Sequence, residues 1–126
     1  MKVLIVEDSP LVRKMYGLVF SKREHELTTA EDGRKALDVL SADPRRFDLI
    51  LLDLRMPDMD GVEFIRAVRL TGRFRDIPIV LTTVEPDTSD LLREALAQGV
   101  AAVVKKPWKP QELRGVVQSV LHEAGH

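Results

Sequence analysis

Short, strongly apolar runs alternate along this 126-residue chain with longer segments in which apolar residues recur every three or four positions. The runs are typical of strands buried on both faces, and the recurring pattern is typical of amphipathic helices. We expect strands at 3–6, 27–30, 49–53, 77–83 and 100–104, and helices at about 10–22, 36–43, 62–72, 86–99 and 113–121. The first helix is predicted from the spacing of Leu11, Met15, Leu18 and Val19.

Strict alternation of strand and helix predicts an α/β fold. The strands should form a parallel sheet with right-handed crossovers and helices on both faces. Five strand–helix units in one small chain favour a flavodoxin-like, doubly wound five-stranded sheet with strand order 2-1-3-4-5 and five helices. The polar run at 27–30 suggests an edge strand. Length and hydrophobic content suit a single domain spanning residues 1–126.

One acid stands out in the segment 47–61, FDLILLDLRMPDMDG. Asp53 closes an apolar run and is followed by the turn-forming pairs Met56-Pro57 and Asp60-Gly61. An acid is out of place in a core, but ligands of open α/β sheets bind beyond the carboxyl ends of the strands. The competing interpretation is that Asp53 caps the loop or the next helix.

Composition narrows the classes of partner. The 19 basic and 20 acidic residues give a formal net charge of −1, which offers no general attraction to nucleic acid or to anionic membranes. The absence of cysteine excludes disulfides and thiolate metal sites. Of the three histidines two lie in the tail, and the three form no recognisable metal-binding spacing. No run is long enough to span a membrane and the N-terminus does not resemble a signal peptide, so a cytoplasmic location is expected.

Polar residues gather at the carboxyl ends of the expected strands. Because parallel strands place these ends at one edge of the sheet, the following residues should meet there: Glu7, Asp8, Asp53, Thr82, Thr83, Lys105 and Lys106. Three neighbouring carboxylates repel one another unless a cation lies among them. Mg²⁺ fits best, because it needs few protein ligands and leaves room for a phosphate oxygen. A lysine and a hydroxyl suit the remaining phosphate oxygens, so the set predicts a phosphoryl site with an aspartate nucleophile.

Taken singly, each of these residues has an ordinary explanation as a strand end, a helix cap or a surface side chain. Their joint occurrence resembles the receiver domain of two-component response regulators, and the resemblance extends from Lys2 to about Leu121. The matching residues are the pair Glu7-Asp8, Asp53 within LLDLRMPDMDG, Thr83 in IPIVLTT, and Lys106-Pro107. Thr83 is selected over Thr82 by its distance from Asp53, and Lys106 over Lys105 by the proline that follows.

The resemblance implies a role for each matched residue. Asp53 would accept a phosphoryl group from a phosphohistidine of a sensor histidine kinase or phosphotransfer protein. Glu7, Asp8 and Asp53 would hold Mg²⁺ with the backbone carbonyl of Arg55. Lys106 would pair with the phosphoryl group and Thr83 would hydrogen-bond to it. The Lys106–Pro107 bond is expected to be cis.

The implied function is that of a phosphorylation-activated switch, not an enzyme acting on an external metabolite. It would catalyse only its own phosphorylation and slow dephosphorylation. The output would be a changed surface over the fourth helix, fifth strand and fifth helix, which would act on an unknown downstream protein or a fused output domain. Direct binding of nucleic acid by this chain is not expected, and a homodimer through the last helices remains open.

Three features depart from the family pattern. Val103 stands where an aromatic residue commonly reports the switch, and Val84 is bulkier than the small residue common after the switch threonine. Arg55 and Glu85 flank the site, and we hypothesise that they form an ion pair that slows hydrolysis of the phosphoryl group.

Two other classes of function remain as alternatives. A receiver-fold interaction module that works without phosphorylation would tolerate the missing aromatic. A haloacid-dehalogenase-like phosphatase also uses a strand-end aspartate with Mg²⁺, but it needs a second aspartate where this chain has Arg55. A flavodoxin is rejected because Glu7-Asp8 would repel the phosphate of a flavin.

Overall fold

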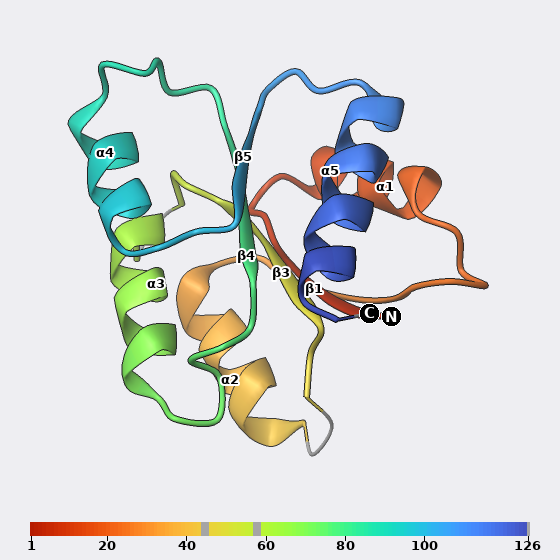
Figure 1. Ribbon diagram of the computed structural model, residues 1–126, viewed down its shortest axis with the longest axis horizontal. Helices are drawn as coiled ribbons and strands as arrows, with labels where there is room; N and C mark the ends of the chain where they lie inside the picture. Colours follow the sequence, from red (N-terminus) through yellow and green to blue (C-terminus); the bar gives the residue numbers. More distant parts are fainter. Residues whose placement is uncertain (44–45, 57–58, 126) are drawn as a thin grey trace.

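The computed structural model describes residues 1–43, 46–56 and 59–125. Its ten elements alternate as expected: β1 (Lys2–Val6), α1 (Pro10–Val19), β2 (Glu26–Ala30), α2 (Gly33–Ala42), β3 (Leu49–Asp53), α3 (Gly61–Leu70), β4 (Ile79–Thr83), α4 (Asp90–Ala97), β5 (Ala102–Lys105) and α5 (Pro110–Glu123). The strands pair in parallel in the order β2-β1-β3-β4-β5 (Figure 1). The flavodoxin-like prediction is confirmed, including the edge position of the polar strand β2.

Helices cover both faces of the sheet (Figure 1). On one face α1 and α5 pack on alternate strand residues such as Val3, Ile5 and Val80. On the other, α2, α3 and α4 pack on the intervening residues, among them Leu4 and Leu81. Every residue of β1, β3 and β4 is buried, which explains why these strands are continuous apolar runs instead of alternating patterns.

Four helices are preceded by a residue whose side chain accepts a hydrogen bond from a backbone N–H in the first turn. These N-caps are Ser9, Asp32, Asp60 and Ser89. The cap of α3 is thus Asp60, so the alternative in which Asp53 caps the next helix is wrong. The other half of that interpretation, a cap on the loop, agrees with the hydrogen bond that the Asp53 carboxylate accepts from the backbone of Arg55.

Some predicted boundaries are wrong by a few residues. α1 ends at Val19 because Phe20 adopts an extended backbone and turns inward, and α4 begins at Asp90, after its N-cap Ser89, instead of at Pro86. β4 starts at Ile79 because the Ile77 N–H donates to the carbonyl of Phe74 in a turn. β5 starts two residues late and includes Lys105. The expected turn at Met56-Pro57 and the helix stop at Pro44 fall partly outside the described residues.

The apolar spacing that predicted α1 lies mostly on its outer side. Leu11 and Leu18 are 68% and 84% exposed, and Met15 is 41% exposed. The inner side is formed by Val12, Tyr16 and Val19, which has the same helical spacing. Both sides of this helix are apolar, so periodicity alone could not distinguish the face that is buried.

The loop after β3 is anchored close to Asp53. The Gly61 N–H donates to the Leu54 carbonyl at 2.8 Å, and a Cβ at Gly61 would lie 2.9 Å from that carbonyl oxygen. A side chain would therefore push the start of α3 away from the end of β3. Within the described residues, no helix is long and apolar enough to cross a membrane.

Candidate functional site

Three carboxylates converge at the carboxyl end of the sheet. Glu7 and Asp8 directly follow β1, and Asp53 is the last residue of the adjacent β3. Each can offer an oxygen such that the three ligand atoms lie within 4.8 Å of one another. Glu7 is 1% and Asp53 8% exposed, whereas Asp8 faces solvent. The cluster is thus a largely buried concentration of negative charge with one open side.

Lys106 supplies positive charge to this cluster. Its ammonium lies 2.7 Å from a Glu7 oxygen and 3.5 Å from Asp53 Oδ2. Its backbone N–H donates to the Thr83 carbonyl at 2.8 Å, which fixes the chain just after β5. Burial opposes the charge, but the hydrogen bond to Glu7 and the charge of Asp53 outweigh it and raise the pKa of Lys106. The Lys106–Pro107 bond is cis, as expected.

Asp53 is electrostatically strained despite this partner. Burial, followed by the charge of Glu7, raises the pKa of Asp53 from 3.8 to about 7, while Lys106 pulls the pKa down. Two carboxylates around one ammonium leave excess negative charge in a poorly solvated place. Such a site favours an additional cation.

The donors at the site match what Mg²⁺ prefers. Mg²⁺ binds through one or two carboxylates, keeps several waters and accepts only hard oxygen ligands. The carboxylates of Glu7, Asp8 and Asp53 can each offer one such oxygen, and Asp8 is exposed to solvent. The raised pKa of Asp53 also indicates that Lys106 alone does not offset the burial of its carboxylate and the charge of Glu7. The residues therefore fit Mg²⁺.

Thr83 ends β4, the strand next to β3. Its hydroxyl accepts a hydrogen bond from the Glu85 N–H at 3.0 Å, so its own proton is available to another acceptor. The neighbouring Thr82 instead pairs with Asp53 in the sheet register, and its hydroxyl lies on the α1/α5 face. Both threonines lie at the strand end, and the resemblance selected Thr83. Alternation along β4 places its side chain on the face opposite to that of Thr82.

Arg55 and Glu85 form the ion pair that the sequence suggested. Arg55 Nε donates to Glu85 Oε1; the Arg55 side chain is largely exposed and the Glu85 side chain largely buried. The pair joins the segment after β3 to the segment after β4. The expected role of the Arg55 carbonyl as a metal ligand remains a prediction.

The two adjacent lysines diverge, as alternation along a strand requires. Lys105 donates to the Glu85 carbonyl and lies 3.0 Å from Asp87, so it holds the segment after β4 instead of entering the acid cluster. Lys106 enters the cluster. Lys105 is thereby separated from the carboxylates that surround Lys106.

Two residues of α1 that the sequence did not single out support this site. Arg13 donates to the carbonyls of Glu7 and Asp8, at 2.8 and 3.1 Å, and fixes the backbone that carries both acids. Tyr16 is buried behind the cluster and donates to Thr82. Arg13 and Tyr16 are one helical turn apart and lie on the inner side of α1. The apolar pattern of Leu11, Met15 and Leu18 indicated a different side of the helix.

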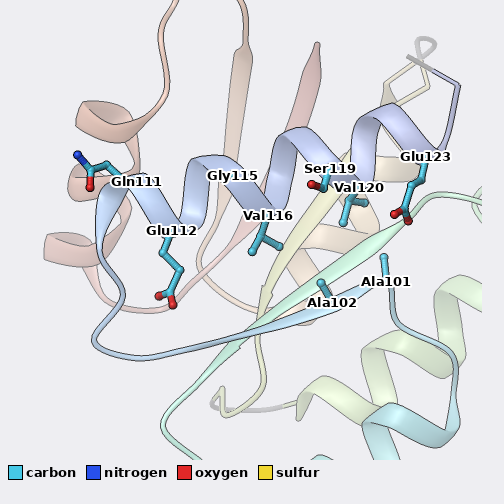
Figure 2. A pocket seen from close by; sticks show the side chains of 9 residues that line it. All are labelled: Ala101, Ala102, Gln111, Glu112, Gly115, Val116, Ser119, Val120 and Glu123. Atoms are coloured by element: carbon cyan, nitrogen blue, oxygen red, sulfur yellow. The ribbon is translucent and has the colours of Figure 1, made fainter.

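Two surface hollows lie near these elements. An apolar hollow of about 310 Å³ borders the site and is lined by Val12, Met15, Val84, Lys106, Pro107 and Trp108. A second, open groove of about 560 Å³ runs between the start of β5 and α5. Figure 2 shows Val116 and Val120 of α5 pointing towards Ala101 and Ala102 in this groove. Of these two hollows, the first includes Lys106, which forms ion pairs with Glu7 and Asp53, and the second does not.

Comparison with known proteins agrees with this geometry. The family model described as the response regulator receiver domain matches residues 3–118. A chemotaxis protein CheY homolog of Campylobacter jejuni is 31% identical over 122 residues, covering 96% of this chain and 92% of that protein. The structure of chemotaxis response regulator CheY4 of Vibrio cholerae has a TM-score of 0.83 and 38% identity, covering 94% of this chain and 97% of that one.

A further structure bears on the metal. The receiver domain of sensor histidine kinase PA1611 of Pseudomonas aeruginosa, with a magnesium ion coordinated in its active-site cleft, has a TM-score of 0.82 and 29% identity, covering 96% of this chain and 97% of that one. Other relatives are longer: the chain spans 21% of the response regulator ORR26 of Oryza sativa and 32% of the cyclic di-GMP phosphodiesterase response regulator RpfG of Xanthomonas campestris. With the fold, the acid cluster and a family match over most of its length, this chain belongs to the response regulator receiver domain family.

Proposed function

We propose that this chain is a phosphorylation-activated receiver whose phosphoryl acceptor is Asp53. A carboxylate oxygen of Asp53 attacks the phosphorus of a phosphohistidine on a sensor kinase or phosphotransfer protein. The new O–P bond forms as the P–N bond breaks, and the donor imidazole leaves with the electron pair of that bond. The observation that carries this proposal is a strand-end aspartate lying beside two further acids and the Lys106 ammonium.

Each neighbouring residue has a part in this proposal. The Lys106 ammonium, 3.5 Å from Asp53, is placed to neutralise charge on the incoming phosphoryl group. The hydroxyl of Thr83 has a free proton to donate to a phosphoryl oxygen. Glu7, Asp8 and Asp53, with the carbonyl of Arg55, would hold Mg²⁺. When bound, Mg²⁺ supplies further neutralisation of the phosphoryl oxygens.

The decisive test is the intact mass of the protein after incubation with Mg²⁺ and acetyl phosphate. The parent is expected to gain one phosphoryl group, because Asp53 combines a nucleophilic oxygen with nearby positive charge. Asp53→Asn and a Mg²⁺-free sample should gain none. If the parent stays unmodified with acetyl phosphate and also with a phosphohistidine protein, the proposal fails in favour of an interaction module that works unphosphorylated.

The Arg55–Glu85 pair is proposed to shield the phosphoryl group from water. Arg55→Ala is expected to shorten the dephosphorylation half-life by about two- to fivefold, the factor that corresponds to a partly exposed ion pair. Loss of phosphoryl can be followed by mass after the donor is removed. The control is Lys105→Ala, which removes the ammonium that donates to the Glu85 carbonyl and leaves Arg55 unchanged. An unchanged half-life in Arg55→Ala would refute the shielding.

The phosphohistidine partner is proposed to dock on the outer side of α1. Leu11 and Leu18 are exposed on α1 at helical spacing from Met15, which lines the apolar hollow that Lys106 borders. A partner that covers these three residues would reach the open side of the acid cluster. The test uses a phosphotransfer protein that phosphorylates the parent. Leu18→Glu is expected to slow this transfer by about tenfold or more, because a leucine buried in the interface contributes about 1.5–3 kcal/mol to binding.

Two measurements isolate this effect. Phosphorylation of Leu18→Glu by acetyl phosphate should equal that of the parent, because the small donor does not need a docking surface. Leu70→Glu changes an equally exposed leucine on α3, on the opposite face of the sheet, and should leave both donors unaffected. Equal transfer rates to Leu18→Glu and Leu70→Glu would refute docking on α1.

The output is proposed to be a change in the surface formed by α4, β5 and α5. The open groove between β5 and α5 belongs to this surface and is flanked by the acidic Glu112 and Glu123 (Figure 2). A downstream protein or a fused domain would bind there. Amide chemical shifts that stay unchanged in this region on phosphorylation would contradict the proposal.

Self-phosphorylation and slow self-dephosphorylation are the only reactions proposed. A phosphatase is disfavoured because Arg55, not an acid, lies two residues beyond Asp53.

A further inference from the structure

An aromatic pair lies directly behind the acid cluster, between α1 and the segment that follows β5. The rings of Tyr16 and Trp108 are stacked, with centroids 5.2 Å apart and planes inclined by 27°. Tyr16 is 1% exposed, and its hydroxyl donates to Thr82 Oγ1 at 3.2 Å. Through these two contacts Tyr16 joins α1 both to β4, one residue before Thr83, and to the chain two residues beyond Lys106.

The segment that carries Lys106 has little other support. β5 ends at Lys105 and α5 begins at Pro110, so residues 106–109 belong to neither a strand nor a helix. Among the described residues, the backbone bond from Lys106 N–H to the Thr83 carbonyl fixes the start of this segment, and the helical bond from Leu113 N–H to the Lys109 carbonyl fixes its end. Between these two points, Trp108 packs into the cluster of α1 and α5 residues. The stacking on Tyr16 therefore helps to decide where the segment lies.

The phenol of Tyr16 is also close to the charged groups of the site. Burial, and more weakly the charge of Glu7, raises its pKa, while the bond to Thr82 and the charge of Lys106 lower it. The phenol thus remains a neutral donor at physiological pH and lies within electrostatic range of both ends of the Glu7–Lys106 ion pair.

We propose that Tyr16 and Trp108 are positioning residues for phosphoryl acceptance, which hold the Lys106 ammonium at Asp53 by fixing the segment 106–109. The inference rests on the proposed function of Asp53 as the acceptor. Because Tyr16 is buried, the stacked pair is rigid, and it packs against the segment 106–109 from the side of α1. The Glu7 carboxylate attracts the Lys106 ammonium from the edge of the sheet. Displacement of a charged group by about 1 Å can cost up to a hundredfold in rate, so a small shift of Lys106 has a large consequence.

Four variants and a control separate this role from simple stabilisation. Tyr16→Leu and Trp108→Leu remove the stacking, whereas Tyr16→Phe and Trp108→Phe retain it. Trp108 is only half-buried, so its variants remain informative if Tyr16→Leu does not fold. Phe20→Leu is the matched control, because Phe20 is buried in the same cluster at the other end of α1. Melting temperatures are recorded for all five.

The first readout is the rate constant for phosphorylation by acetyl phosphate with saturating Mg²⁺. The two leucine variants are expected to be about tenfold slower than the parent, and the phenylalanine variants should recover most of the rate. Phe20→Leu should lower the melting temperature without changing the rate.

The second readout is acetylation of Lys106 by acetic anhydride, measured by mass spectrometry relative to Lys105. The Lys106 side chain is 18% exposed against 45% for Lys105, so a displaced Lys106 should react faster.

The outcomes decide the question separately from the proposed function. Slower phosphorylation together with faster labelling of Lys106 in both leucine variants supports the positioning role. Parent-like labelling, or faster labelling with a parent-like rate, overturns it. If the parent accepts no phosphoryl group at all, the proposed function fails, and unchanged Lys106 labelling would then also refute the placement of Lys106 by the aromatic pair.

Discussion

Lys106→Met is expected to destabilise the Mg²⁺-free protein by about 2–4 kcal/mol. Methionine retains the apolar stem of the lysine but removes the ammonium that lies 2.7 Å from Glu7 and 3.5 Å from Asp53. The Glu7 carboxylate, 1% exposed, then stays buried without its cation, which costs far more than losing a surface ion pair. Urea unfolding in EDTA measures the loss.

The neighbouring lysine provides the control for this result. Lys105 is more exposed and pairs with the exposed Asp87, so Lys105→Met should cost about 1 kcal/mol or less. Added Mg²⁺ should restore part of the stability lost in Lys106→Met, because the cation replaces positive charge among the acids. Equal losses in the two variants would show that Lys106 does not stabilise the acid cluster.

Asp53→Asn is expected to stabilise the Mg²⁺-free protein at pH 8, by an amount on the order of 2–4 kcal/mol. The folded pKa of Asp53, about 7, exceeds the usual 3.8 because burial and Glu7 disfavour its charge. The stability that protonated Asp53 contributes is therefore fully present below about pH 4 and is lost as pH rises through about 7. Asparagine is neutral throughout and escapes this loss.

The pH profile makes this prediction specific. In EDTA, the stability difference between Asp53→Asn and the parent should grow from pH 4 to pH 8 and level off above that. With saturating Mg²⁺ the difference should shrink or reverse, because the asparagine lacks the carboxylate that helps to bind the cation. A variant that is less stable than the parent at pH 8 in EDTA would contradict a strained Asp53. Asp8→Asn, at an exposed acid of the same cluster, is the control variant.

Much of the fold was accessible from the sequence because its elements are locally encoded. β1, β3 and β4 are buried on both faces and thus appear as continuous apolar runs. Serine and aspartate caps mark four helix starts with a local hydrogen bond. Strand ends in a parallel sheet meet at one edge, so the acids after β1 and β3 could be placed together from their positions in the chain alone. The family resemblance then distinguished Thr83 from Thr82 and Lys106 from Lys105.

Other features depended on contacts between distant residues. The buried side of α1 could not be chosen, because Leu11 and Leu18 are as apolar as Val12 and Val19, and only packing against α5 and the sheet separates them. The stacking of Tyr16 on Trp108 and its bond to Thr82 join residues 92 and 66 positions apart, which no local pattern encodes. The sequence by itself therefore determined the alternating elements and the chemical groups at the sheet edge. Tertiary structure decided which apolar side is covered and how the charges are held, because both depend on burial and distance.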